Sequence, residues 1–357
     1  MGLHTLTRSR RSRERSAMQH VAIDLGSKES QVCIRGADGT LLQERKHPTR
    51  KLGELMQTWP TSRVVLETSS ESFRIADLAL AAKHEVRVVP ATLAKQLGVG
   101  ERGVKTDLRD ARKLSEVSCR IDLPSVHIPS ADARELRSML RSRETLVSTR
   151  TKLVNHVKGW MRTQLWKLRS GAPATLPDRL RAYAASVQQP LPAHIEETLV
   201  VLEALAIQIN ASNRRVKKLA KEHSVARLLM TIPGVGPVTS LTFIAAVDRV
   251  DRFERTHHLQ SYLGLTPGEN SSSERERRTS ITKAGATSVR RTLVQAAWTA
   301  IRAVPNAPMV KWAAQIAERR GKYIAVVALA RKMAGIMFAL WRDNTTYSAF
   351  KAAASLQ

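Results

Sequence analysis

Short runs of apolar residues separated by polar turns predict an α/β domain in the first third of the chain. Residues 30–47 alternate around the turn dipeptide Asp38-Gly39, which is typical of a β-hairpin. Further strands are predicted at 20–26, 62–69 and 85–90, with helices at 51–59 and 72–84. This order of strands and helices indicates a mixed sheet.

Residues 132–170 contain no proline, and apolar residues recur there every seven positions. This spacing predicts a long helix with a seam like that of a coiled coil. The seam comprises Leu140, Val147, Val154, Met161 and Leu168, beside a stripe of Met139, Leu146, Leu153 and Trp160. A second long helix follows a proline-rich connection and has Ile195, Leu202, Ile209 and Val216 at the same spacing. The pair indicates an antiparallel arm or dimerisation element, and a helical bundle within one domain is the alternative.

From residue 226 the pattern is mainly helical to about residue 342, interrupted by a glycine-rich segment and a serine-rich segment. The expected fold class is therefore α/β plus α. The expected parts are a basic disordered tail at 1–17, an α/β domain at 18–128, a helical arm at 129–225, a mostly helical domain at 226–345 and a tail at 346–357.

The charge balance narrows the classes of partner. The chain has 58 Lys and Arg against 31 Asp and Glu, and its net charge of +27 favours a nucleic acid, whose counterions basic residues displace. Arg331 and Lys332 interrupt the longest apolar stretch, so we expect no membrane span. Two cysteines provide no disulfide framework, which indicates a reducing, cytoplasmic location. Because aromatic residues make up only 4%, we expect contacts mainly with phosphate backbones.

Four carboxylates are candidates for chemistry. Asp24 and Glu67 each end a predicted strand, and such side chains project into the ligand-binding edge of an α/β sheet. Asp107 and Asp110 are spaced i, i+3, which places both on one face of a helix. Together these oxygen ligands suit Mg²⁺ or Mn²⁺, and paired metals serve phosphodiester transfer. Each carboxylate taken alone is more often structural, as a turn cap or part of a solvated helix face.

The order D…E…DxxDA, from Asp24 to Ala111, resembles the RuvC-type, RNase H-like domain of the DEDD transposases of insertion sequences, of the IS-one-ten and IS-eleven-eleven type. The resemblance covers about residues 18 to 345 and implies that Asp24, Glu67, Asp107 and Asp110 form a metal-binding tetrad. An actin-like sugar kinase also has D-x-G after its first strand. That class needs a second D-x-G loop after a later strand, which this chain lacks.

The segment "IPGVGPVTS" resembles a helix-hairpin-helix element. Gly234 and Gly236 permit a tight turn whose backbone N–H groups contact a nucleic-acid phosphate. An ordinary helix–helix turn is the alternative, and in the family resembled the motif opens the C-terminal domain.

The resemblance also gives the serine-rich segment a role. In this family a nucleophilic serine follows a Leu-Thr-Pro segment and precedes a lysine-glycine motif, which here are 265–267 and 282–285. Spacing from Pro267 assigns the nucleophile to Ser272. Ser273 stands where the family usually has glycine, which leaves Ser271 and Ser273 as alternates.

The implied reaction is DNA strand cleavage and transfer through a covalent 5′-phosphoserine. Positive charge for the phosphate and for DNA would come from Arg275, Arg277, Arg278 and Lys283. The resemblance further implies double-stranded DNA at the element ends and target, a structured guide RNA of the bridge or seek type, and a homo-oligomer, either a dimer or a tetramer. We expect such a protein to be associated with the nucleoid.

Two other classes of function fit parts of the sequence. A metal-dependent nuclease or Holliday-junction resolvase would need the carboxylates but would use water in place of Ser272. A non-catalytic nucleic-acid-binding protein would need neither.

Overall fold

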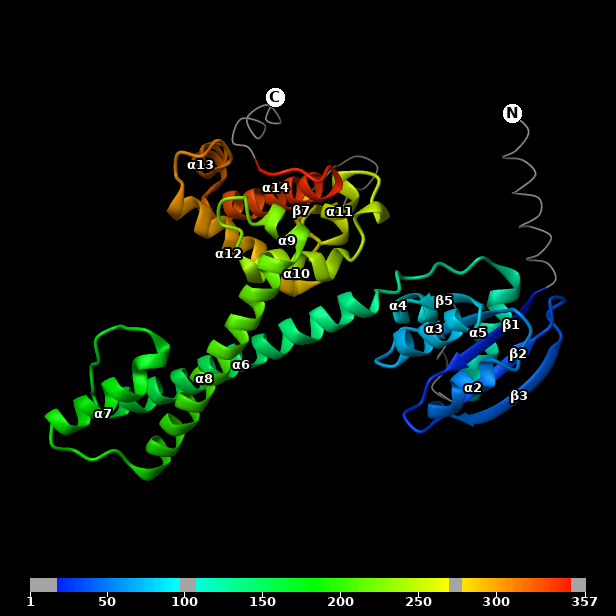
Figure 1. Cartoon of the computed structure of the whole chain (residues 1–357), viewed down its shortest axis with the longest axis horizontal. Helices are drawn as coiled ribbons and strands as arrows, with labels where there is room; N and C mark the ends of the chain where they lie inside the picture. Colours follow the sequence, from blue (N-terminus) through cyan, green and yellow to red (C-terminus); the bar gives the residue numbers. More distant parts are fainter. Residues whose placement is uncertain (1–17, 97–106, 270–277, 348–357) are drawn as a thin grey trace. The chain divides into compact units, whose positions relative to one another are not determined.

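The computed structural model describes residues 18–96, 107–269 and 278–347, and the chain divides into two compact units (Figure 1). The N-terminal unit is Met1–Pro129 and the C-terminal unit is Ser130–Gln357. The hydrophobic core clusters of the described residues each lie within one of these units.

A mixed five-stranded sheet of order β3-β2-β1-β4-β5 forms the N-terminal unit, as the apolar pattern predicts. The strands are β1 (Gln19–Asp24), β2 (Glu29–Arg35), β3 (Leu41–Pro48), β4 (Ser62–Glu67) and β5 (Glu85–Val89). β1, β4 and β5 run parallel, whereas β2 is antiparallel to both of its neighbours. The parallel strands therefore end at the same edge of the sheet, which is the edge that holds Asp24 and Glu67.

Alternation along the strands gives the sheet two buried faces. On one face, Val21 and Ile23 pack with α2 (Leu52–Met56) and α3 (Ser72–Ala81). On the other, Ala22 and Val65 pack with Leu114 of α5 (Asp107–Arg120), which follows the short α4 (Ala91–Gln96). Because side chains alternate along a strand, residues two positions apart share a face. Asp24 and Glu67 thus lie on the face covered by α5.

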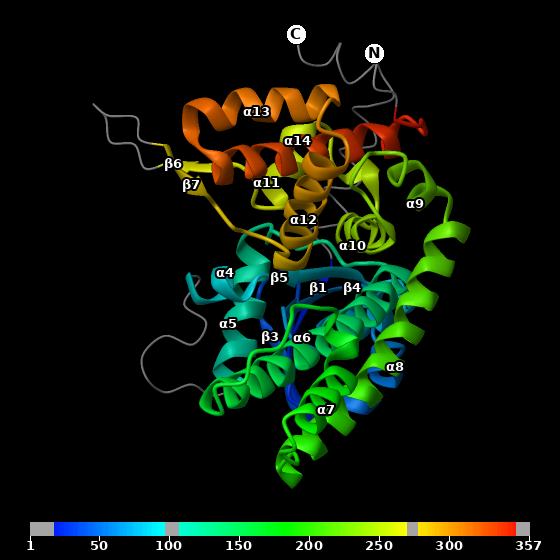
Figure 2. The ribbon, with the colours of Figure 1, turned by 90° about the vertical axis from the view of Figure 1, so that its left-hand side faces the viewer.

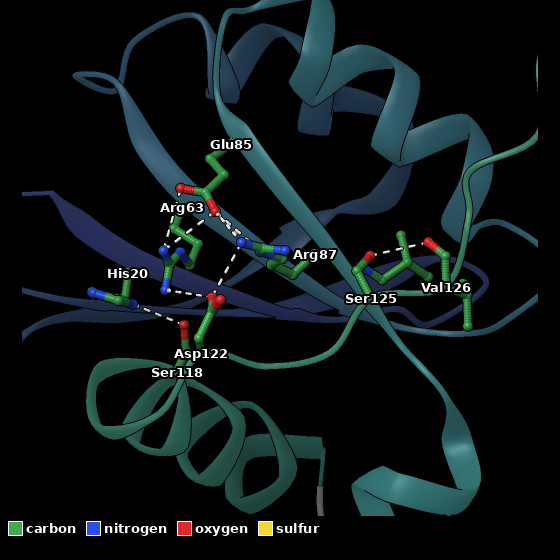
Figure 3. Close-up of polar contacts among 9 residues, drawn as sticks. His20, Arg63, Glu85, Arg87, Ser118, Asp122, Ser125 and Val126 are labelled. Carbon is green, nitrogen blue, oxygen red and sulfur yellow. Dashed lines mark hydrogen bonds and ion pairs between the residues drawn. The ribbon is translucent and has the colours of Figure 1, made fainter. Parts of the chain in front are cut away.

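A polar network ties the C-terminal end of α5 to the opposite edge of the sheet (Figure 3). His20 Nδ1 lies 2.8 Å from Ser118 Oγ, and both residues are buried. Arg63 Nη2 lies 3.3 Å from Glu85, and Arg87 Nη2 lies 3.1 Å from Asp122 just after α5. Burial, with the nearby Arg63 guanidinium, lowers the pKa of His20 below the ordinary histidine value of 6.5.

We expect the free energy of unfolding to fall as the pH drops below about 6.5, because the unfolded chain binds a proton more readily than buried His20 does. In a His20→Gln variant this dependence should be weaker. The measurement is chemical unfolding followed by circular dichroism across a pH series, with exposed His194→Gln as the control. Identical pH slopes for wild type and His20→Gln would contradict the assignment.

Three helices begin the C-terminal unit: α6 (Ala131–Thr163), α7 (Leu176–Ser186) and α8 (Ala193–Glu222). α6 and α8 pack side by side, and Val154 and Met161 share a buried cluster with Ile195 and Leu202 (Figure 1). Two long helices are thus present, while a coiled-coil arm stays a prediction.

The predicted helix over 132–170 is too long. α6 ends at Thr163, and Leu165 adopts a left-handed conformation, with φ of 56°, that a helix cannot continue through. Leu168 packs against the same cluster from the connection rather than from the helix. The helix α7 inside that connection was not predicted, because prolines in and around it were interpreted as a non-helical break between the two long helices.

The rest of the unit is helical apart from one small sheet. Its elements are α9 (Ser224–Leu229), α10 (Pro237–Val247), α11 (Thr256–Tyr262), β6 (Pro267–Glu269), β7 (Arg278–Ile281), α12 (Thr287–Ala303), α13 (Pro308–Arg320) and α14 (Lys322–Arg342). α13 and α14 pack side by side (Figure 2). Within the described ranges, α14 alone is long and apolar enough to cross a membrane, and half of its apolar window is buried. Met333 and Phe338 are fully buried in the main cluster, so we interpret α14 as a core helix.

Gly234 lies where α12 passes closest to the turn before α10. Its φ is +85°, and a Cβ atom there would lie 2.3 Å from the carbonyl oxygen of Ala296. Gly236 has no atom within 4 Å of such a Cβ and caps α10 in an extended conformation. The first glycine is therefore required by helix packing, and the second leaves its surroundings open. A helix-hairpin-helix contact with nucleic acid stays a prediction.

The same substitution at these two glycines should have opposite effects. Gly234→Ser should lower the free energy of unfolding by about 1–3 kcal/mol, because of the positive φ and the clash with α12. Gly236→Ser should leave stability unchanged or slightly raised, since serine is a favoured N-cap residue. Thermal unfolding followed by calorimetry gives both values. Equal stabilities would show that the contact with α12 does not constrain the turn.

Candidate active site

Asp24 and Glu67 lie next to each other at one edge of the sheet. β1 and β4 are parallel and pair Ile23 with Leu66, so the next residues on the two strands are these carboxylates. Both are partly exposed, and both lie on the face covered by α5. The sequence prediction that strand ends bring these two carboxylates to one edge agrees with this register.

Asp110 is placed at the level of this acidic edge by the way α5 packs on the sheet. Ser118 meets His20, and Ser115 Oγ lies 3.1 Å from Sγ of Cys33, which pairs with Ala22 of β1. α5 therefore runs antiparallel to β1. From Ser118 back to Asp110 the helix advances roughly 12 Å, and from His20 to Asp24 the strand advances roughly 13 Å. Asp110 itself is buried, with 7% of its surface exposed.

An ion pair adds a third attachment of α5. Arg112 donates to both carboxylate oxygens of Glu44 on β3, and this contact lowers the pKa of Glu44. Arg112 lies two positions after Asp110, on a helix whose charged residues also fit a solvated face. Here it orients the helix that carries Asp110. Its guanidinium is half exposed, so we assign it a positioning effect rather than a large stability term.

The four predicted ligands are not all brought together. Asp107 begins α5, but its side chain lies outside the described residues. In the portion of the chain that is described, no three His, Cys, Asp or Glu side chains are grouped closely enough to hold a metal ion. The donor set itself suits Mg²⁺ or Mn²⁺, which prefer carboxylate oxygens. The metal site therefore stays a prediction.

Two polar residues beside the acidic edge were missed from the sequence. Gln31 of β2 pairs with Asp24, and Lys46 of β3 pairs with Gln31. Directly paired residues share a face, so the row Glu67, Asp24, Gln31 and Lys46 crosses the sheet on the side of α5. The pairing of Gln31 with Lys46 could have been found from the sequence, because the register of the predicted hairpin determines which of its residues lie opposite each other.

The serine-rich segment joins the two strands of the small sheet. Ser271, Ser272, Ser273, Arg275 and Arg277 lie outside the described residues. β6 and β7 pair antiparallel on either side of the segment, Pro267 with Ile281 and Glu269 with Arg278. The two strands on either side of the segment thus form a hairpin, which was not predicted from the sequence. Arg278 begins β7, and its side chain is also outside the description.

The base of this hairpin is held tightly against α11. Gly264 and Gly285 both have positive φ, and a Cβ at either would lie 2.1 Å from a carbonyl oxygen of the facing segment. Arg290 of α12 donates to the carbonyls of Leu263 and Gly285, each at 3.1 Å. Lys283 is exposed, and its backbone N–H donates to the carbonyl of Gly264 at 3.2 Å. Its side chain is free to face a phosphate while its backbone is fixed.

Comparison with protein families matches the two parts of the chain that carry these features. One family model, described as a transposase of the IS110 DEDD type, matches residues 21–164. A second, described as "Transposase IS116/IS110/IS902 family", matches residues 226–310. The first match contains the acidic edge and α5. The second contains the turn at Gly234 and Gly236, and also the serine hairpin, which consists of β6, β7 and the serine-rich segment between them. Both models thus describe DNA transposases.

Individual relatives agree with the models. A transposase for insertion sequence element IS1111A of Coxiella burnetii is 29% identical over 68% of this chain and 68% of its own length. A probable family 20 transposase of Pseudomonas aeruginosa is 26% identical over 92% of this chain and 98% of its own. The putative transposase y4qE of Sinorhizobium fredii is 30% identical over 73% of this chain and 70% of its own. The chain belongs to the IS116/IS110/IS902 family of transposases.

Proposed function

We propose that this transposase cuts and rejoins DNA at insertion-sequence ends and target sites through Ser272, with a divalent metal held by Asp24, Glu67, Asp107 and Asp110. The observation that carries the proposal is the acidic edge, where neighbouring strands and α5 set carboxylates at one level. The serine hairpin on its fixed base is the second support.

In this mechanism the Ser272 hydroxyl attacks a phosphorus atom of the DNA backbone and loses its proton. A phosphoserine ester forms at the 5′ side, and the 3′ oxygen leaves as a hydroxyl. The ester keeps the energy of the broken bond for rejoining to another strand. A serine hydroxyl is a weak nucleophile unless it is activated, and a bound Mg²⁺ or Mn²⁺ would supply that activation and polarise the phosphate.

The basic residues around the hairpin would offset the negative charge of the DNA phosphate. Arg275, Arg277 and Arg278 follow the serines within a few positions, and Lys283, further along the chain, is exposed on a fixed backbone. Positive groups placed where negative charge develops stabilise the transition state. Gly234 and Gly236 would add a contact between backbone N–H groups and a DNA phosphate, with Gly236 the more open of the two.

The partners beyond DNA belong to the same proposal. A structured guide RNA would pair with donor and target DNA, and the net charge of +27 gives the chain the capacity to bind two polyanions. A dimer or tetramer would let Ser272 of one copy meet the carboxylates of another. The protein would act in the cytoplasm at the nucleoid, where its DNA lies.

Three substitutions test the residues. Asp24→Asn, Asp110→Asn and Ser272→Ala should each abolish strand exchange, because a ligand or the nucleophile is lost, while binding of DNA and RNA persists. The measurement is recombination of a plasmid reporter with the native flanking DNA present. The control is Ser261→Ala, an exposed serine on α11, which should recombine normally. Normal recombination by Ser272→Ala would remove that residue from the mechanism.

A covalent trap distinguishes the proposed chemistry from water-dependent cleavage. With labelled element-junction DNA, Mg²⁺ and the co-expressed flanking RNA, a denaturing gel should show a DNA adduct, and mass spectrometry should place it on the peptide spanning 269–275. An adduct on Ser271 or Ser273 would move the nucleophile by one position. Cleaved DNA without an adduct would favour a nuclease, and intact DNA with RNA bound would favour a non-catalytic binder.

A further inference from the structure

The C-terminal unit carries an exposed aromatic ring beside a second ring and a lysine. Tyr323, in the first turn of α14, is 82% exposed, although aromatic residues are scarce in this chain. Its ring lies 6.5 Å from that of Trp298 on α12, at an interplanar angle of 78°. Lys322 Nζ lies 4.9 Å from the Trp298 ring centre. Lysine thus covers part of the tryptophan, whereas the tyrosine ring is open to solvent.

A shallow hollow runs along α12 next to these rings. It has a volume of about 590 Å³ and is lined by Gln295, Trp298, Thr299 and Arg302. These residues are spaced i, i+3, i+4 and i+7, so they form one face of the helix. The hollow therefore offers an aromatic wall, two neutral hydrogen-bonding side chains and a guanidinium.

One arginine lines the hollow, and further basic residues precede Tyr323 in the chain. Arg302 lies in the last turn of α12, and the last turn of α13 ends in Arg319 and Arg320, just before Lys322 and Tyr323. Glu318 is the acidic residue nearest to them in this stretch of the chain. An exposed ring that follows a lysine and lies near a hollow lined by an arginine is a combination with which proteins hold a base and the phosphates on either side of it.

We propose that Tyr323, with Trp298, Lys322 and Arg302, forms a site for an unpaired nucleotide. The open ring would stack on the base, and the cations would contact the flanking phosphates. A base in a duplex has both faces covered by its neighbours, so the site selects unpaired nucleotides of DNA or RNA over double-stranded DNA. The proposal rests on nucleic-acid binding by this transposase, and it does not depend on the serine or carboxylate chemistry.

The test compares two substitutions of similar size at Tyr323 in the full chain. Tyr323→Phe keeps the ring, whereas Tyr323→Leu removes it but remains apolar. The side chain is exposed, so both variants should fold, which equal melting temperatures would verify. Fluorescence anisotropy in EDTA, at one fixed salt concentration, then measures Kd for a labelled oligothymidylate, an oligouridylate and a duplex.

Tyr323→Leu should raise the Kd for the single strand about 5- to 100-fold, the loss expected for one stacked base. Tyr323→Phe should stay within about twofold of wild type, and the duplex should change by less than about twofold with either variant. Loss confined to oligouridylate would assign the site to RNA, and loss confined to oligothymidylate would assign it to unpaired DNA. Unchanged single-strand binding, or an equal loss for the duplex, would overturn the proposal. EDTA prevents metal-dependent cleavage, so either outcome leaves the roles of Ser272 and the carboxylates to the strand-exchange experiment.

Discussion

The position of α5 along β1 is the constraint on which the acidic edge depends. Asp24 and Glu67 are placed by strand pairing alone, but Asp110 comes from a helix that could in principle slide. A shift of one helical turn would move it about 5.4 Å, more than twice the length of a metal–oxygen bond. Three polar contacts oppose such a shift, from Ser118 to His20, from Ser115 to Cys33 and from Arg112 to Glu44. They lie at different points along the helix, so together they define its register as well as its orientation.

The base of the serine hairpin is held in position differently, by the close approach of two backbone segments. Gly264 and Gly285 let two segments pack at distances that no side chain would permit, and Arg290 then links their carbonyl groups. The constraint is placed at the base, where the strands are short and their pairing alone is weak. In the N-terminal unit side-chain contacts alone position α5, whereas here two glycines permit the close approach and one arginine side chain then links the segments.

Much of the fold followed from hydrophobic pattern. The five strands of the sheet and the buried seam of α8 were readable, because alternation and heptad spacing reflect which residues must be buried. The errors have local causes. α6 ends earlier than predicted, and Leu165 just beyond it adopts a left-handed conformation. A leucine in the sequence gives no sign of such a conformation. The strands β6 and β7 are too short to show alternation, and β6 includes Pro267 and Gly268.

Of the candidate site, the strand-end carboxylates could be predicted. The depth of Asp110 could not, since it depends on contacts between residues about 80 to 100 positions apart.

The two units have separate hydrophobic cores. Among the described residues, the clusters beneath the sheet draw on residues 21–128, and those of the helical part draw on residues 136–347. Each core is therefore stabilised by residues of its own unit. A substitution that loosens the packing beneath the sheet would leave the buried contacts around the base of the serine hairpin in place, and the reverse holds too. The sequence of either unit can therefore change without disturbing the apolar packing of the other.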